Sequence, residues 1–355
     1  MALSPTNKTN SALSREIIEL FDRLPNIKHG RLLERALGVL LRIASDEVDR
    51  LDLKILTYAL EDLEKGFKIF YPYRHVRKIT IFGSARIASD TSEYLLAVKF
   101  ARRITDLGFM VLTGAGGGIM QAGNEGAGRE HSFGLNIQLP FEQESNPFIV
   151  DDPKLIDFKY FFTRKLFFLR ESDAIALFPG GFGTQDEAFE TLTLCQTGKY
   201  GPAPLVLIDE PGGDYWQSWN KYICSQLLNR GLISPEDPSL YTITDDIEEA
   251  CAAIRQFYRV YHSSRYVRGR FVMRLNVKLR EDFIEELNQD FSDILVRGRI
   301  EPTPALPEEI GDETENLPRL IFDFNQRDLG RLYQMINRIN QLEIPSPETE
   351  HPERK

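Results

Sequence analysis

From residue 77 onward, short apolar runs alternate with stretches of helix length, and this alternation constrains the fold more than any other feature of the chain. Five runs stand out: "KITIFGSA", "FMVLTGAG", "FGLNIQLP", "AIALFPGG" and "PLVLIDE". Strands that are apolar along their whole length are typical of a parallel sheet covered by helices on both faces. Because crossover connections are right-handed, the pattern predicts an α/β fold with a Rossmann-like, doubly wound parallel sheet over residues 75–262.

The regions on either side follow other patterns. Residues 1–74 start with a polar leader and continue with apolar residues at helical spacing, which predicts a helical N-terminal extension. Residues 263–342 contain a strand, a helix, a second strand and a last helix, so we expect a small α+β appendage of β-α-β-α order. Its middle, "EPTPALPEEIGDETENLP", is acidic and rich in proline, which is typical of a solvated loop. The tail, residues 343–355, is predicted to be disordered.

Charge and composition exclude several classes of partner. The formal net charge of −10 disfavours binding to nucleic-acid polymers and to anionic membrane surfaces, although a local basic pocket can still hold one phosphate. Apolar runs stay well short of the roughly 20 residues of a membrane span, and the polar start does not resemble a signal peptide, so we expect a cytoplasmic protein. Cys195, Cys224 and Cys251 lack metal-ligand spacing, which predicts free thiols and no metal site.

Three of the predicted strands run into loops rich in glycine or small residues, at 82–86, 112–128 and 178–184. The carboxyl ends of parallel strands share one edge of a sheet, so we expect these loops to border one crevice at the topological switch point. Glycine lets backbone N–H groups approach an anion, and a following helix adds positive charge, so phosphate is the expected guest. The absence of a GK[ST] ending and of a GxGxxG after the first strand disfavours ATPases and ordinary NAD-binding proteins.

Two groups of basic residues could either bind an anionic ligand or have a purely structural role. Arg164 and Lys165 lie near the start of a predicted helix, where cations are unfavourable unless an anion is near, and a solvated charge pair is the alternative. Arg265, Arg268 and Arg270 lie near a strand start, where they could bind an anion or form a solvated or salt-bridged face.

An acidic cluster follows the third glycine loop. Asp186, Glu187 and Glu190 fall on the first two turns of the helix after "FPGGFGT", and Thr184 is expected to cap that helix. One acid satisfies the helix dipole, but three acids would repel a phosphate. We therefore expect one of them to meet a ribose hydroxyl or a water to be activated.

The glycine loops and the helices that follow them resemble those of the LOG family, long mislabelled "lysine decarboxylase". The family's PGGxGTxxE signature is reproduced by Pro179, Gly180, Gly181, Gly183, Thr184 and Glu187. The blocks "IFGSAR", "TGAGGGIMQAGNEGA", "YFFTRK" and "FETLTLCQTGK" occur in the family's order over about 75–230. Two positions depart from the pattern: Ala115 stands where glycine is frequent, and Gln185 where leucine is common.

The resemblance implies a Rossmann-like homodimer that hydrolyses the N-glycosidic bond of a nucleoside 5'-monophosphate, AMP-like or a cytokinin riboside monophosphate, to free base and ribose 5-phosphate, with neither an organic cofactor nor a metal. Arg164 and Glu187 match the family's catalytic pair. The substrate-binding residues, expected from the glycine loops and from the family's nucleotide-binding positions, are Gly83, Ser84, Gly114, Gly116, Gly117, Gly118, Met120, Asn124, Lys165, Pro179, Gly180, Gly181, Gly183, Thr184 and Glu190.

Two other functions are compatible with the fold or with the family's older label. Some relatives of this fold bind ligands such as molybdenum cofactor without hydrolysing nucleotides, so a non-catalytic nucleotide or cofactor carrier or sensor remains the alternative. The presence of both Arg164 and Glu187 favours the enzyme. A decarboxylase is disfavoured because nothing in the sequence supplies a pyridoxal phosphate site with its Schiff-base lysine.

Overall fold

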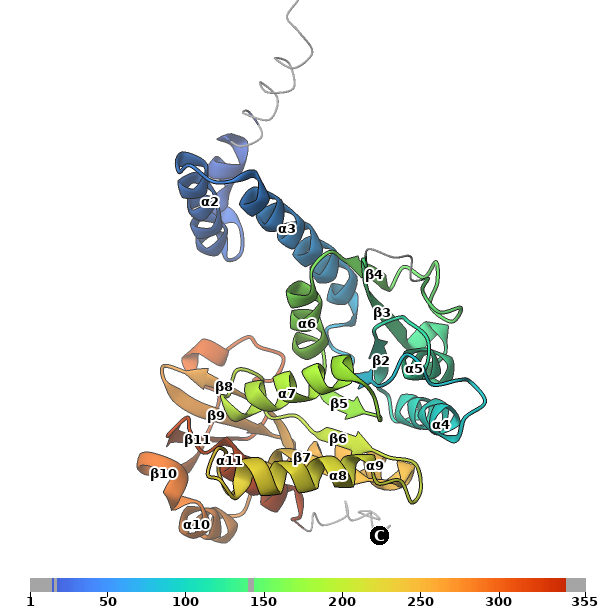
Figure 1. Cartoon of the computed structure of the whole chain (residues 1–355). Coiled ribbons are helices and arrows are strands. Elements are labelled where there is room, and N and C mark those ends of the chain that lie inside the picture. Colours follow the sequence, from blue (N-terminus) through green and yellow to red (C-terminus); the bar gives the residue numbers. More distant parts are fainter. Residues whose placement is uncertain (1–14, 16–17, 140–143, 343–355) are drawn as a thin grey trace, which may run out of the picture. The chain divides into compact units, whose positions relative to one another are not determined.

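The computed structural model describes residue 15, residues 18–139 and residues 144–342, and it divides the chain into two compact units, one up to residue 61 and one from residue 62 (Figure 1). Residues 1–14, which hold most of the predicted leader, and the predicted disordered tail lie outside the described residues. The first unit contains a short 3₁₀ turn (Leu24–Asn26), α2 (Gly30–Ser45) and the first part of α3 (Arg50–Phe70). The predicted helical N-terminal segment is confirmed.

A seven-stranded parallel sheet, in the order β4-β3-β2-β1-β5-β6-β7, forms the centre of the second unit. Its strands are β1 (Lys78–Phe82), β2 (Met110–Thr113), β3 (Ser132–Ile137), β4 (Leu155–Phe158), β5 (Ala174–Leu177), β6 (Leu205–Ile208) and β7 (Tyr241–Thr244). The five apolar runs of the sequence are β1, β2, β3, β5 and β6, so the predicted fold class is confirmed. The sequence analysis missed β4 and β7, because these two edge strands are only partly buried and lack a continuous apolar run.

Helices cover both faces of this sheet. They are α4 (Ser92–Asp106), α5 (Ile119–Ala127), α6 (Phe161–Arg170), α7 (Phe182–Gln196), α8 (Tyr215–Tyr222) and α9 (Ile247–Phe257). One core includes residues of α4, α5 and α9, while a separate core includes residues of α6, α8 and the end of α3. The chain adds strands outward from β1 to β4 and then returns to β5, so the topological switch point lies between β1 and β5.

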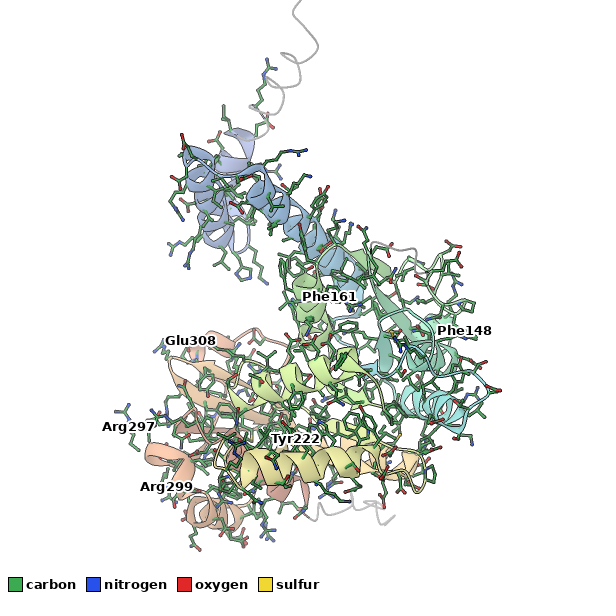
Figure 2. The ribbon with its side chains drawn as sticks, in the orientation of Figure 1. Phe148, Phe161, Tyr222, Arg297, Arg299 and Glu308 are labelled. Atoms are coloured by element: carbon green, nitrogen blue, oxygen red, sulfur yellow. The ribbon has the colours of Figure 1, made fainter. Side chains whose placement is uncertain are left out.

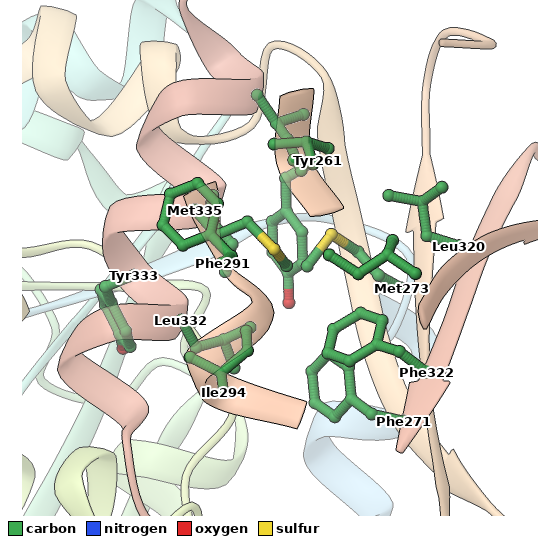
Figure 3. Packing of buried hydrophobic residues seen from close by; sticks show 14 of the residues in the cluster. Tyr261, Phe271, Met273, Phe291, Ile294, Leu320, Phe322, Leu332, Tyr333 and Met335 are labelled. Atoms are coloured by element: carbon green, nitrogen blue, oxygen red, sulfur yellow. The ribbon is translucent and has the colours of Figure 1, made fainter. Parts of the chain in front are cut away.

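The C-terminal appendage is a four-stranded antiparallel sheet in the order β10-β11-β9-β8. Its elements are β8 (Tyr261–Val267), β9 (Arg270–Leu275), α10 (Glu281–Asp290), β10 (Leu295–Thr303), β11 (Arg319–Phe324) and α11 (Leu329–Asn340). Figure 3 shows the core of this region, in which Phe271, Met273 and Phe322 from the strands pack beside Leu332 and Met335 from α11.

The expected β-α-β-α order of the appendage is wrong because two strands were missed. The strand β8 was missed because its residues are mostly polar and only partly buried, and a tight turn at Arg268 and Gly269, which both have positive φ, joins it to β9. The strand β10 is a largely exposed edge strand, and its charged residues Arg297 and Arg299, labelled in Figure 2, pair with Asp323 of β11 and Glu285 of α10. Such a strand lacks the apolar pattern on which the prediction depended.

The expectation of a solvated loop between β10 and β11 is wrong at Glu309, whose side chain is fully buried. Arg274 Nη2 donates to Glu309 Oε1 at 2.6 Å, and Arg319 Nε donates to Glu309 Oε2 at 2.9 Å. Arg265 Nε lies 3.2 Å from Glu309 Oε1. Because buried charges are costly unless they are paired, these arginines explain why an acidic loop can pack onto the sheet.

The arginine cluster near β8 forms a salt-bridged face. Arg265 also pairs with Asp312, Arg268 pairs with Glu308, and Arg270 pairs with Asp323. Of the two interpretations of this cluster, the structural one is therefore favoured.

None of the described helices combines the length and the apolar character that a membrane span requires. The described residues also contain no group of three or more His, Cys, Asp or Glu side chains placed to hold a metal ion.

Candidate functional site

A pocket of about 790 Å³ opens at the carboxyl edge of the large sheet, beside the switch point between β1 and β5. The loops after β1, β2 and β5 all contribute to it, together with α6 and the end of β3. Its lining consists of residues 82–86, Gly114, Met120, Ile137, Leu139, Phe161, Arg164, Phe168 and residues 180–187. The three glycine loops thus border one pocket, as the sheet topology predicts.

Most of the predicted site residues lie on the wall of this pocket. They are Gly83, Ser84, Gly114, Met120, Arg164, Gly180, Gly181, Gly183, Thr184 and Glu187. Lys165 and Glu190 are not part of the lining but contact each other at 2.8 Å beside Glu187. The remaining predicted residues, Gly116, Gly117, Gly118, Asn124 and Pro179, lie behind the wall, and their part in substrate binding stays a prediction.

The residues behind the wall hold the glycine loops in shape. Asn124 is fully buried, and its Oδ1 accepts hydrogen bonds from Thr113 Oγ1 at 2.7 Å and from Asn146 Nδ2 at 2.9 Å. Gly118 has a φ of +60°, and a Cβ there would lie 2.2 Å from the carbonyl oxygen of Ser84. The loops after β1 and β2 are therefore packed against each other so closely that only glycine fits.

Two helices near the pocket, α5 and α7, begin without a side-chain cap. The N-cap residues of α5 and α7 are Gly118 and Gly181, which have no side chain with which to cap. The expected capping of α7 by Thr184 is wrong, because the helix begins at Phe182 and Thr184 lies buried within its first turn. The first N–H groups of an α-helix lack intrahelical partners, so an uncapped N-terminus favours an anion.

The acidic cluster of α7 is organised around one lysine. Lys165 Nζ lies 2.8 Å from Asp186 Oδ2 and 2.8 Å from Glu190 Oε2, but 3.8 Å from Glu187 Oε1. Two of the three acids are therefore closely paired on one side of α7, and Glu187 is left to face the pocket. This arrangement eases the apparent conflict between three acids and a bound phosphate, because the lysine offsets one of their negative charges.

Glu187 has the electrostatic character of a proton acceptor that works near neutral pH. Its side chain is 7% exposed, and burial raises its pKa from the ordinary value of 4.5 to about 7. The charge of Lys165 opposes this rise, whereas the neighbouring Glu190 adds to it. A carboxyl group with a pKa near 7 is about half ionised at neutral pH, which suits a general acid or base.

Arg164 enters the pocket as a cation that lacks a full set of partners. Its guanidinium carbon lies 5.0 Å from the ring centre of Phe161 and 5.5 Å from that of Phe168. Figure 2 shows Phe161 on α6, the helix that carries Arg164. The Nε of Arg164 is buried and has no hydrogen-bond partner among the described residues. Burial lowers the pKa of Arg164, and the charge of Glu187 opposes that effect. An unpaired buried donor on an arginine points to an anionic guest.

Sequence reasoning missed two contributors to the site. Arg86 lines the pocket and is exposed, and its position directly after the "GSA" turn was the available signal. Tyr215, at the start of α8, accepts a hydrogen bond from Gln185 Nε2 at 2.6 Å and donates one to the carbonyl oxygen of Gly180 at 2.5 Å. Tyr215 lies about thirty residues from the loop that it holds, so only the fold reveals this contact.

Part of the central domain is similar to known proteins. Residues 117–254 match the family described as "Possible lysine decarboxylase". Two relatives are named cytokinin riboside 5'-monophosphate phosphoribohydrolase. The one from Rhodococcoides fascians is 36% identical over 92 residues, which is 26% of this chain and 44% of that protein. The one from Mycobacterium tuberculosis is 31% identical over 104 residues, which is 29% of this chain and 53% of that protein.

The chain thus spans about half the length of each of these relatives. Among solved structures, the molybdenum cofactor carrier protein from Chlamydomonas reinhardtii is 22% identical, with a TM-score of 0.36 over 51% of this chain and 98% of that one. The matched range includes most of the second glycine loop and the whole of the third. Residues 117–254 of the central domain are therefore similar to this family.

Proposed function

We propose that this protein hydrolyses the N-glycosidic bond of a nucleoside 5'-monophosphate to give the free base and ribose 5-phosphate. The observation that carries the proposal is the pairing, in one pocket, of a buried carboxyl group at Glu187 with an incompletely paired guanidinium at Arg164. The names of the two similar phosphoribohydrolases support the same reaction class. Arg164 and Glu187 are accordingly our proposed catalytic pair.

The phosphate of the substrate is proposed to bind where the glycine loops meet. The uncapped N-terminus of α7, whose N-cap Gly181 lines the pocket, offers backbone N–H groups and a partial positive charge there. Arg164 and Arg86 add two guanidinium groups to the same pocket, and guanidinium is well suited to bind phosphate oxygens in pairs. This arrangement supports a monophosphate as the anchoring group.

The base and the ribose are proposed to occupy the apolar part of the same pocket. Its lining includes Phe82, Ile137, Leu139, Phe161 and Phe168. Such side chains favour a flat, weakly polar base, and the pocket volume of about 790 Å³ lies within the usual range of about 300–1,000 Å³ for small-molecule sites. Adenine and its N6-alkylated derivatives, the cytokinin bases, are the bases that we would test first.

In the proposed reaction the C1'–N bond breaks, and its electron pair leaves with the base. The oxygen of a water molecule bonds to C1', and one proton of that water passes to the carboxylate of Glu187 and then to the departing base. The positive charge that develops on the sugar is stabilised by the same carboxylate. Only the ionised form of Glu187 can accept the proton, so the rate is expected to rise with pH up to about 7.

The test is to incubate the purified protein with a panel of nucleoside 5'-monophosphates, including AMP and isopentenyladenosine monophosphate, and to separate the products by chromatography. We expect free base and ribose 5-phosphate in equal amounts from at least one member, with loss of product in Glu187→Gln. Glu61→Gln, which changes an exposed acid on α3, is the matched control. Nucleotide binding without release of base would contradict hydrolysis and favour the carrier or sensor function.

The homodimer implied by the family resemblance also remains a proposal. Several large apolar side chains of α6 and α7 are exposed, among them Phe161, Phe162, Leu166, Phe182 and Phe189. Apolar surface of this kind is typical of an interaction site. Measuring the molar mass in solution by light scattering, with Leu166→Glu as the disrupting variant, would test the dimer.

A further inference from the structure

The last part of α3 contacts the helix that carries Arg164, through a buried carboxylate. Asp62 is 1% exposed and lies in the second unit of the chain. Its Oδ2 accepts hydrogen bonds from the backbone N–H of Tyr160 at 3.2 Å and from Thr163 Oγ1 at 2.6 Å. The backbone N–H of Lys159 donates to both carboxylate oxygens, at 3.1 and 3.0 Å. A single side chain thus binds the two residues that precede α6 and one residue of its first turn.

Close packing fixes the same two helices against each other. A Cβ on Gly66 would lie 2.2 Å from the ring of Phe167, so α3 passes α6 at a distance that only glycine permits. Phe70, the last residue of α3, stacks with Phe167 at 5.9 Å and with Phe133 of β3 at 4.7 Å between ring centres. Figure 1 shows the end of α3 beside α6. The contact therefore leaves α6 little freedom to slide or rotate.

The helix α6 needs this external partner for two reasons. Its N-cap residue, Tyr160, makes no side-chain cap hydrogen bond to the described residues. In addition, Arg164 and Lys165 place two positive charges close to the positive end of the helix dipole, which is unfavourable. The carboxylate of Asp62 accepts from the N–H groups of Tyr160, the N-cap residue, and of Lys159 before it, and it places a negative charge at this end of the helix.

Position along α6 links Asp62 to the proposed chemistry. The backbone N–H of Arg164 donates to the carbonyl oxygen of Tyr160 at 3.2 Å, which makes Arg164 part of the first turn that Asp62 holds. Lys165 follows in the same turn and lies 3.8 Å from Glu187. A shift of this turn would move both cations relative to the pocket.

We propose that Asp62 is a positioning residue for the site: it fixes the first turn of α6 and thereby the places of Arg164 and Lys165 relative to Glu187. The catalytic part of this inference rests on the proposed function. It assigns a role to the end of the N-terminal helical segment, which lies outside the family match at residues 117–254.

The positioning itself is tested without any substrate, by hydrogen–deuterium exchange of the full chain. In Asp62→Asn we expect faster exchange at residues 159–165 than in the wild type, because the carboxylate that accepts from two backbone N–H groups is lost. Thr163→Val, which removes only the hydroxyl partner, should show a smaller increase. Glu61→Gln, the exposed neighbour on α3, should match the wild type. Equal protection of residues 159–165 in all four proteins would overturn the proposal.

The link to catalysis is tested by the pH dependence of kcat and by kcat/KM. A turn displaced by about 1 Å is expected to lower kcat/KM of Asp62→Asn by about tenfold to hundredfold. Lys165 lowers the pKa of Glu187, so its displacement should also move the acidic limb of the kcat profile to higher pH. Loss of stability alone would not move that limb. An unchanged limb and an unchanged kcat/KM, measured on folded Asp62→Asn, would contradict the catalytic link.

The two parts of the inference can fail separately from the proposed function. If the wild type hydrolyses no nucleotide, the proposed function fails, and the exchange experiment still decides whether Asp62 holds α6. If Asp62→Asn does not fold, Thr163→Val gives the same kinetic test, because it removes the hydroxyl that donates to Asp62. We then expect a smaller shift of the acidic limb of the kcat profile, in the same direction.

Discussion

Two buried carboxyl groups, Glu187 at the large sheet and Glu309 at the small one, both lie among positive charges, yet they differ in protonation. Burial alone would raise the pKa of Glu309, but hydrogen bonds from Arg274 and from the backbone N–H of Leu306, together with the charges of Arg274 and Arg319, bring it below its usual value. Burial raises the pKa of Glu187 to about 7, because the nearest cation, Lys165, is 3.8 Å away and shared with two other acids.

The comparison shows that direct hydrogen bonds, rather than nearby charge alone, decide whether a buried carboxyl group stays ionised or can take up a proton near neutral pH. Arginine donors bind both oxygens of Glu309 and keep it ionised, so it serves to attach a loop to the sheet. Glu187 is held close to Arg164 and Lys165 without such bonds, and it retains the capacity to take up a proton. The following predictions test this comparison and the loop that positions Glu187.

The largest expected effect is on turnover. We predict that Glu187→Gln lowers kcat by about 10²–10⁴-fold, because the amide cannot accept the proton from water. Glu309→Gln should leave kcat per folded molecule close to that of the wild type. Rates on the preferred nucleotide, normalised to the folded fraction, provide the measurement. Equal losses in both variants would remove the distinction between the two acids.

The next effect is on stability and concerns Glu309. Breaking a buried ion pair leaves uncompensated charge, so Glu309→Gln should lower the free energy of unfolding by about 3–5 kcal/mol at pH 7. Because the pKa of Glu309 is depressed in the folded state, this contribution is present above its unfolded pKa and is lost as pH falls through the folded value. Urea unfolding at several pH values measures both. A variant as stable as the wild type at pH 7 would show that the carboxylate is not needed.

A change of opposite sign is expected for Glu187. Its folded pKa of about 7 exceeds the ordinary value of 4.5, so the folded state binds the proton more tightly and loses stability as pH rises between these values. Glu187→Gln should therefore be more stable than the wild type at pH 8, by about 3 kcal/mol, with little difference at pH 4. Thermal or urea unfolding at the two pH values tests this. If Glu187→Gln were less stable than the wild type at pH 8, the ionised carboxylate of Glu187 would have enough favourable partners in the folded state, and the prediction would be wrong.

The smallest effect concerns the loop that precedes Glu187. Tyr215→Phe removes one hydroxyl that bonds both Gln185 and the carbonyl oxygen of Gly180. Each of these two hydrogen bonds contributes about 0.5–1.5 kcal/mol to the position of the loop, and only part of that loss reaches the substrate, so we expect KM to rise by no more than about tenfold with a smaller change in kcat. Steady-state kinetics of this variant beside Tyr222→Phe, an exposed tyrosine of the same helix, tests the loop's role. An unchanged KM would show that the contact is dispensable.

The parts of the fold that could be predicted from the sequence are those whose patterns are local. The strands β1, β2, β3, β5 and β6 are continuous apolar runs, whereas β4, β7 and β10 are edge strands whose polar residues conceal them. The convergence of the three glycine loops follows from parallel topology alone.

The electrostatic state of the site could not be predicted in the same way. Nothing in the spacing of Asp186, Glu187 and Glu190 says which of them Lys165 pairs closely and which it leaves for the pocket. Asp62 and Tyr215 act over long stretches of chain, and their partners become visible only when the helices are packed. The burial of Glu309 was missed for the same reason, because its arginine partners come from other strands.

The measurement that tests the account most directly is a carbon-13 NMR titration of the glutamate side-chain carboxyl groups in the full chain, with Glu187→Gln and Glu309→Gln used to assign the two signals. We predict that Glu187 titrates with a midpoint near 7, while Glu309 stays ionised to below the usual range of a glutamate. A midpoint for Glu187 near its ordinary value of 4.5 would contradict the claim that this carboxyl group is poised to accept a proton at neutral pH.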